Sequence, residues 1–213
     1  MTLHFLGDNT EAKYLIEGVL TGHDYGRGRA FPLRFGVDQR IAGFAFLART
    51  LWLLGDAHGA EDAAEAAIAE AKELDHVSSL CCALLEGGCA LWAISGQWKK
   101  LADAGATAVK IADRYNLGFW RSYAEGFIAL ARSNISPSSS SLRSLQATAA
   151  SLSRIGVHPG YSLFTIGIAR LQANLGDYQG AKKTTDKLIK SIGSEQHWAM
   201  PEILRLKVSL AKH

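Results

Sequence analysis

The sequence has few cysteines, few prolines and no uninterrupted apolar run long enough to cross a membrane. Only 3 of its 213 residues are cysteine and 4 are proline. Cys81 and Cys82 are adjacent and Cys89 follows closely, a set that forms no convincing disulfide framework. Charged residues or glycines interrupt the apolar runs before the roughly 20 residues that a membrane span needs, and no charged and then apolar leader opens the chain. We therefore expect a soluble, cytoplasmic protein with no membrane partner.

Signatures of catalysis, metal binding and nucleotide binding are also missing. The seven histidines show no H-E-x-x-H or paired ligand spacing. The glycine-rich "GRGR" at residues 26–29 follows no predicted strand and lacks a phosphate-loop lysine, so we interpret it as a connector. The serines at 138–141 have no nucleophile-elbow context. We expect no enzyme, catalytic residue, metal or cofactor, although a site assembled across helices stays an open alternative that would need a converging acid and base.

Charge is unevenly distributed along the chain. Residues 1–96 contain 7 Lys and Arg against 13 Asp and Glu, whereas residues 97–213 contain 16 against 7. Such a basic half suits an acidic partner or a nucleic acid, but charged helix faces are usually just solvated. The acidic series Glu61, Asp62, Glu65, Glu70 and Glu73 is interpreted in that way, as a solvated face.

A turn motif recurs along the chain. "LLGDAHGA" at residues 53–60 and "NLGDYQGA" at residues 174–181 share an apolar residue, Gly, Asp and a later Ala. With Gly96 in "ISGQWKKL", the turn glycines are 41 and 80 residues apart, which indicates a repeat of about forty residues. The copy expected near Ser136 is replaced by "SNISPSSSS" at residues 133–141, which we predict to be an exposed loop and the first site of proteolytic cleavage.

Each repeat is predicted to be a pair of helices, because apolar and small residues recur three and four apart on both sides of the turn. The glycine ends one helix in a left-handed conformation, and Asp56 or Asp177 caps the next. The position seven residues before each turn, including the turn expected near Ser136, is occupied by Ala48, Cys89, Ala129 and Ala169. We expect helices to cross closely there, so that only a small side chain fits. We therefore expect Cys89 to be a small buried hydrophobe.

These patterns predict an all-α fold in one domain over residues 1–213. It comprises a lead-in helix near residues 9–20 and a connector (1–36), four helix pairs (38–75, 77–116, 118–156 and 159–193, within 37–193) and a C-terminal helix (200–213). The turn "LGDYQGA" resembles that of tetratricopeptide repeats, so we expect a tetratricopeptide-like right-handed solenoid with a repeat longer than the usual one.

Six segments carry a more specific resemblance: "FLGDNTEA" (5–12), "RFGVDQR" (34–40), "LARTLWLLG" (47–55), "HVSSLCCAL" (76–84), "ALWAISGQW" (90–98) and "PEILRLK" (201–207). In this order they look like the C-terminal helical-repeat region of bacterial winged-helix transcriptional regulators with a central ATPase module. The resemblance implies a regulatory or sensor module that receives a protein or small-molecule effector. The chain departs from the family in having no phosphate loop and in its tail "KVSLAKH", which replaces a Gly-Glu and a run of leucines.

The expected function is therefore a non-catalytic protein- or ligand-binding module, with a winged-helix or ATPase regulator as a candidate partner. In such stacks the first helix of each pair lines the concave face. The turn-based alignment nominates five residues for a shared binding groove there: Arg49, Trp52, Glu86, Tyr123 and Arg170. Arginine and aromatic side chains are enriched at binding hot spots, although Arg49 and Arg170 could equally cross-link helices. The alternative is a nucleic-acid-binding repeat that uses the basic C-terminal half, whose binding would weaken steeply with salt.

Overall fold

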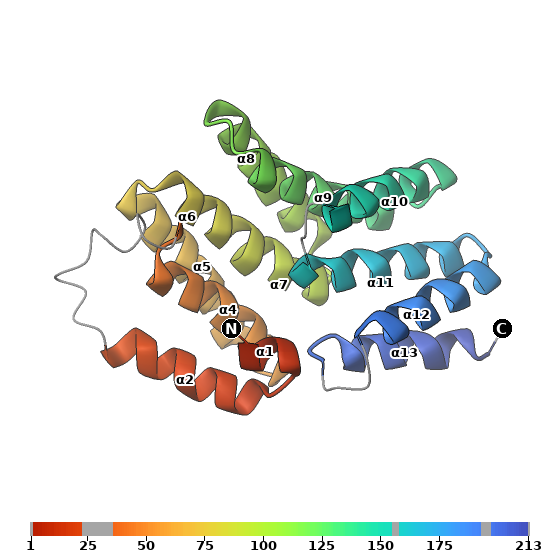
Figure 1. Cartoon of the computed structure of the whole chain (residues 1–213), viewed down its shortest axis with the longest axis horizontal. Helices are drawn as coiled ribbons and strands as arrows, with labels where there is room; N and C mark the ends of the chain where they lie inside the picture. The colour runs from red at the N-terminus through yellow and green to blue at the C-terminus, as the bar shows by residue number, and fades with distance from the viewer. Residues whose placement is uncertain (1, 23–35, 155–157, 193–196, 213) are drawn as a thin grey trace.

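The computed structural model describes residues 2–22, 36–154, 158–192 and 197–212, and every regular element within these ranges is helical (Figure 1). The expected all-α class is confirmed. The elements are α1 (Thr2–Leu6), α2 (Asn9–Gly22), α4 (Gln39–Leu53), α5 (Ala57–Leu74), α6 (Val77–Cys82), η2 (Ala83–Cys89), α7 (Ala90–Ser95), α8 (Trp98–Arg114), α9 (Gly118–Ile135), α10 (Ser139–Arg154), α11 (His158–Asn174), α12 (Tyr178–Ile192) and α13 (Met200–Leu210).

Two helices joined by a short turn match each of the four ranges predicted as helix pairs, although α11 begins at His158, one residue before the predicted range. The partners are α4 with α5, α6–η2–α7 with α8, α9 with α10, and α11 with α12, and the members of each pair pack against each other (Figure 1). Two elements were not predicted. One is the short α1 before the lead-in helix, and the other is the π-helical segment η2 in the middle of α6–η2–α7.

The recurring turn has the backbone that its sequence predicts. Gly55, Gly96 and Gly176 have φ angles of +89°, +76° and +85°, in the left-handed region that glycine adopts without steric cost. Asp56 Oδ1 accepts a hydrogen bond from the backbone N–H of Gly59 at 2.9 Å, and Asp177 Oδ1 accepts one from Gly180 at 2.8 Å. The capping roles of both aspartates are thus confirmed.

The junction of the third pair differs from the expected loop. Helix α9 continues to Ile135 and α10 begins at Ser139, so only residues 136–138 lie between them. Ser138 Oγ accepts from the Ser141 N–H at 3.1 Å, and Ser141 Oγ accepts from the Ser138 N–H at 3.0 Å. Ser133 is buried within α9. The prediction of an exposed loop over all of 133–141 was therefore wrong, because reciprocal serine capping replaces the glycine turn.

Small side chains let the helices approach closely in the core. Ala48, Cys89, Ala129 and Ala169 are all buried, as their shared position predicts, and all three cysteines are free and buried. The segment Val77–Ser95 has a mean hydropathy of 1.7 and is long and apolar enough to span a membrane by length and composition alone. Most of it is buried inside the protein, as in a core helix.

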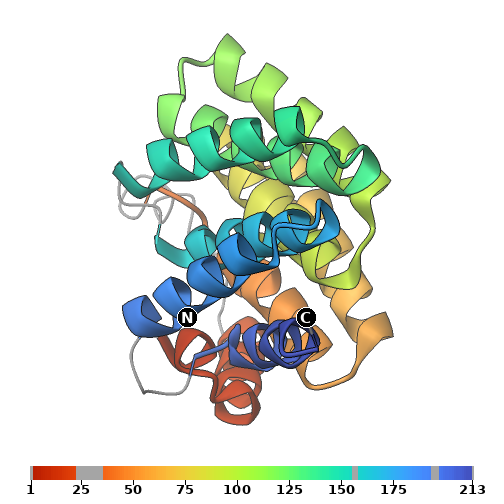
Figure 2. The ribbon, with the colours of Figure 1, turned by 90° about the vertical axis from the view of Figure 1, so that its right-hand side faces the viewer.

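The first and last described segments meet. The backbone N–H of Trp198, just before α13, donates to the carbonyl of Phe5 in α1 at 3.2 Å. The indole of Trp198 also stacks on the His4 ring, with centroids 5.9 Å apart. Figure 2 shows α1, α2 and α13 together at the bottom of the molecule. These contacts hold the segment before α13 against α1.

Candidate functional site

An inner cavity of about 320 Å³ lies where the helices converge. The first helix of every predicted pair contributes to its wall through α4, α7, α9 and α11, and the beginning of α8 and residues 198–205 complete it. Its volume falls within the ~300–1,000 Å³ typical of small-molecule sites. The lining residues are Trp52, Leu53, Ala93, Ile94, Trp98, Leu130, Asn134, Leu163, Ile166, Gly167, Arg170, Trp198, Ala199, Pro201, Glu202 and Arg205.

Most of the cavity wall is apolar, and three indoles dominate it. Trp52 ends α4, Trp98 begins α8 after the Gly96 turn, and Trp198 precedes α13. The side chains of Trp52 and Trp98 are half-buried, and Trp198 is only 3% exposed. Because indoles offer large, rigid apolar faces, this wall is suited to a flat organic ring.

The charged groups of the cavity all come from α11 and α13. Arg170 on α11 and Arg205 on α13 both contact the carboxylate of Glu202. Arg205 Nη1 lies 2.9 Å from Glu202 Oε2, while Arg170 Nη2 contacts Oε1. Burial, and next the positive charge of Arg205, lower the pKa of Arg170 from its usual value. Two guanidinium groups therefore share one carboxylate at this wall.

Two further polar groups belong to residues of the cavity wall. The Asn134 amide nitrogen donates to the Leu130 carbonyl at 2.9 Å, which holds that side chain along α9. The buried indole Nε1–H of Trp198 has no hydrogen-bond acceptor among the described residues. That nitrogen is inaccessible to solvent, so the polar side chains that line the cavity are Asn134, Arg170, Glu202 and Arg205.

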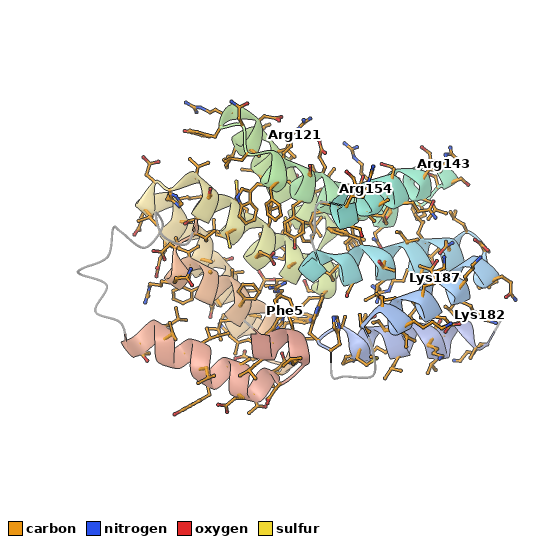
Figure 3. All side chains as sticks on the ribbon, viewed as in Figure 1. Phe5, Arg121, Arg143, Arg154, Lys182 and Lys187 are labelled. Carbon is orange, nitrogen blue, oxygen red and sulfur yellow. The ribbon has the colours of Figure 1, made fainter. Side chains whose placement is uncertain are left out.

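The structure divides the five nominated residues into two groups. Trp52 and Arg170 line the cavity, whereas Arg49, Glu86 and Tyr123 do not. Arg49 and Tyr123 are 0% exposed, so the expectation of one groove shared by all five was wrong for these two residues. The physical reason is tertiary. Phe5 of α1, labelled in Figure 3, has its ring centroid 5.6 Å from the Arg49 guanidinium, and Tyr123 packs against the rings of Phe127 and Phe164.

Arg49, Glu86 and Tyr123 form a buried polar cluster instead. Arg49 Nη1 lies 3.1 Å from Glu86 Oε2, and the Glu86 side chain keeps 14% exposure. The Arg49 guanidinium also lies over the ring of Phe46, 4.5 Å from its centroid. Burial and the Glu86 charge raise the pKa of Tyr123 well above its usual value, so the phenol stays neutral. This cluster joins α4, η2 and α9 inside the core, and of its three side chains only Glu86 keeps any exposure.

Two residues of the acidic series also differ from the expected solvated face. Glu61 on α5 accepts from the indole N–H of Trp92 at 3.2 Å and from the side-chain amide of Gln97. Glu70 forms an ion pair with Arg40 at 2.7 Å. These carboxylates therefore connect helices of neighbouring segments rather than serving solubility alone.

The sequence did not single out Trp98 or Trp198 as site residues. The backbone path from Gly96 brings Trp98 to the cavity, and the contact with α1 brings Trp198 there. Another hollow of about 340 Å³ borders the ends of α5 and α8, but Lys72, Asp75, Arg114 and Tyr115 around it are exposed. The inner cavity is therefore the stronger candidate.

Within the described ranges, no group of three or more His, Cys, Asp or Glu residues could hold a metal ion. The "GRGR" segment at 26–29 lies outside the described residues. Burial raises the pKa of the Cys81 thiol to about 11 and those of Cys82 and Cys89 further. No protein-family model, curated protein or solved structure matches the chain.

Proposed function

We propose that this protein is a non-catalytic ligand-binding module whose inner cavity receives a small-molecule effector. The observation that carries the proposal is the cavity of about 320 Å³, which three tryptophans line and to which α4, α7, α8, α9, α11, α13 and the segment before α13 contribute. Its single carboxylate, Glu202, already contacts two guanidinium groups, so the wall offers binding groups rather than an unpaired acid and base.

The architecture proposed for this module is a tetratricopeptide-like right-handed solenoid with a repeat of about forty residues. Two observations support it. The same left-handed glycine turn recurs at Gly55, Gly96 and Gly176, and the first helix of each pair borders the same cavity. A concave inner surface is the part of such stacks that binds ligands.

A regulatory role in the cytoplasm is the biological setting that we propose. It rests on the resemblance of six segments, spread over most of the chain, to the helical-repeat region of winged-helix regulators with an ATPase module. The three free, buried cysteines suit a reducing compartment. A winged-helix or ATPase protein is accordingly the proposed partner, and reconstitution with such a protein encoded by a neighbouring gene would test it.

Nucleic-acid binding ranks lower because the basic residues are dispersed. Figure 3 labels Arg121, Arg143, Arg154, Lys182 and Lys187, which project from α9, α10 and α12. Arg121 already pairs with Asp113 at 2.9 Å. Binding to a labelled oligonucleotide that weakens steeply between two salt concentrations would favour this alternative over the effector-binding module.

Titration with the fluorescent probe anilinonaphthalene sulfonate tests the ligand-binding proposal. We expect saturable binding at one site, with energy transfer from tryptophan to the probe. Ile94→Trp places a bulky ring in the cavity wall and should reduce the probe's affinity. Ile111→Trp adds the same ring on α8, outside the inner cavity, and should not. Equal binding by both variants, or no binding by the natural protein, would contradict the proposal.

A further inference from the structure

We infer that the ligand of the inner cavity is an aromatic organic anion, with its ring among the tryptophans and its carboxylate, sulfonate or phosphate against the α11–α13 wall. This inference rests on the proposed function and specifies its ligand class. The observation behind it is that one end of a largely apolar cavity carries two guanidinium groups and one carboxylate.

The charged side chains at this wall have a net charge of one positive unit, which favours a negatively charged ligand group. Glu202 can neutralise one guanidinium charge, while Arg170 and Arg205 lie close enough for each to feel the other's charge. Arg170 is the more buried of the pair, with a side chain 38% exposed against 74% for Arg205. An anionic group between them would relieve their repulsion where solvent screens it least.

The hydrogen-bonding groups at this wall also favour an acceptor-only ligand group. Each guanidinium has five N–H donors, and Glu202 takes up a minority of them. A carboxylate, sulfonate or phosphate accepts several charge-assisted hydrogen bonds at once, whereas a hydroxyl or amide on the ligand would bring further donors.

The apolar side chains of the cavity wall favour an aromatic ring for the rest of the ligand. Trp52 and Trp98 come from α4 and α8, and Leu53 and Ile94 lie beside them in the wall. No charged side chain from α4, α7, α8 or α9 lines the cavity. Flat rings stack favourably on indoles, and burying an apolar ring here releases water without leaving a polar group unpaired.

A matched pair of probes separates the inference from the proposed function. Anilinonaphthalene sulfonate and phenylnaphthylamine share one ring system and differ in the sulfonate. We expect the sulfonate probe to bind the natural protein at least about tenfold more tightly than the neutral probe, and Ile94→Trp should weaken the binding of both. Inorganic sulfate alone should compete weakly, because it lacks the ring.

Arg170→Gln and Arg205→Gln test the charged wall. Each should lower the affinity for the sulfonate probe severalfold to about tenfold while leaving the neutral probe's affinity unchanged. Arg143→Gln is the matched control, because it removes the same charge from the exposed surface of α10, outside the cavity, and should alter neither affinity. If Arg170→Gln fails to fold, Arg205→Gln still tests the charged wall, because the Arg205 side chain is mostly exposed and its replacement should leave the fold intact.

The outcomes are distinct. Equal binding of the two probes to the natural protein, or sulfonate affinity that neither cavity variant changes, overturns the anionic ligand class and leaves the ligand-binding function standing. Sulfonate binding that Ile94→Trp does not reduce, or no binding of either probe, overturns the proposed function itself. Selective sulfonate binding that depends on Arg170 or Arg205 supports both.

Discussion

Replacing Glu86 by glutamine should destabilise the fold much more than a comparable change at an exposed ion pair. The substitution keeps the side-chain size but leaves the Arg49 guanidinium, 0% exposed, without its 3.1 Å carboxylate partner. Removing one partner of a buried pair costs about 3–5 kcal/mol. Because Glu86 retains 14% exposure, we expect the lower end of this range, a loss of about 3 kcal/mol in the free energy of unfolding. This loss corresponds to a fall of about 6–12 °C in Tm for a domain of this size.

The same reasoning predicts a specific pattern among related variants. Arg49→Met removes the buried cation and keeps an unbranched apolar chain of similar length, so it should cost less than Glu86→Gln. The double variant Arg49→Met/Glu86→Gln should be more stable than Glu86→Gln alone, because no unpaired charge remains in the core. Glu125→Gln is the control: Glu125 pairs with Arg121 at 3.3 Å with both side chains about half exposed, and its loss should cost under about 1 kcal/mol.

Thermal and urea unfolding followed by circular dichroism measure these differences. The reasoning is refuted if Glu86→Gln is as stable as the Glu125→Gln control, or if the effects of the two core substitutions simply add. Either result would mean that water or a rearranged side chain neutralises Arg49 after the carboxylate is lost.

Three further predictions concern stability. Burial first, and then the charge of Arg49, lower the pKa of His4 from 6.5 to about 2. Between these two pH values His4 is protonated in the unfolded state and neutral in the folded state. The stability associated with neutral His4 is therefore complete above about pH 6.5 and is lost as pH falls toward 2; urea unfolding should show a loss of about 2 kcal/mol between about pH 7.5 and about pH 5 that His4→Asn reduces. Gly126→Ala should cost about 1–3 kcal/mol, since its Cβ would lie 2.9 Å from the Phe164 ring, whereas Gly18→Ala, with nothing within 4 Å, should stabilise α2 by up to about 1 kcal/mol; equal effects in thermal melts would count against the packing. Asp177→Ala removes the 2.8 Å cap of α12 and should lower the unfolding free energy by about 1 kcal/mol, while an unchanged chemical-denaturation midpoint would show that the cap contributes nothing.

Features encoded by neighbouring residues could be predicted from the sequence. The glycine turns and their aspartate caps depend on backbone conformation and hydrogen bonds within a few residues, and Gly55, Asp56 and Asp177 adopt the expected geometry. The burial of Cys89 followed from aligning it with alanines in the other pairs, because a crossing point between helices accepts small side chains in every copy.

Features that depend on distant segments could not be predicted. Helical spacing places Arg49 and Trp52 on the same side of α4, but the fold-back of α1 buries Arg49 and leaves Trp52 at the cavity. The π-helical segment around Glu86 has no reliable local signal, since its i→i+5 bonding is selected by packing. Trp198 belongs to the cavity because it contacts α1, nearly the whole chain away, and periodicity carries no information about such a contact.

The meeting of Trp198 with α1 would link occupancy of the proposed ligand site to local unfolding of α1 and α13. Residues 198–205 form one wall of the cavity, and the Trp198–Phe5 and Trp198–His4 contacts hold that wall in place. Any molecule that binds only the closed cavity must stabilise this docked segment by RT ln(1 + [L]/Kd). Amide protons of α13 and α1 would then exchange with solvent more slowly as ligand concentration rises, while those of α8 and α10 would change little. The exchange rates of α1 and α13 would therefore fall together when the cavity is occupied.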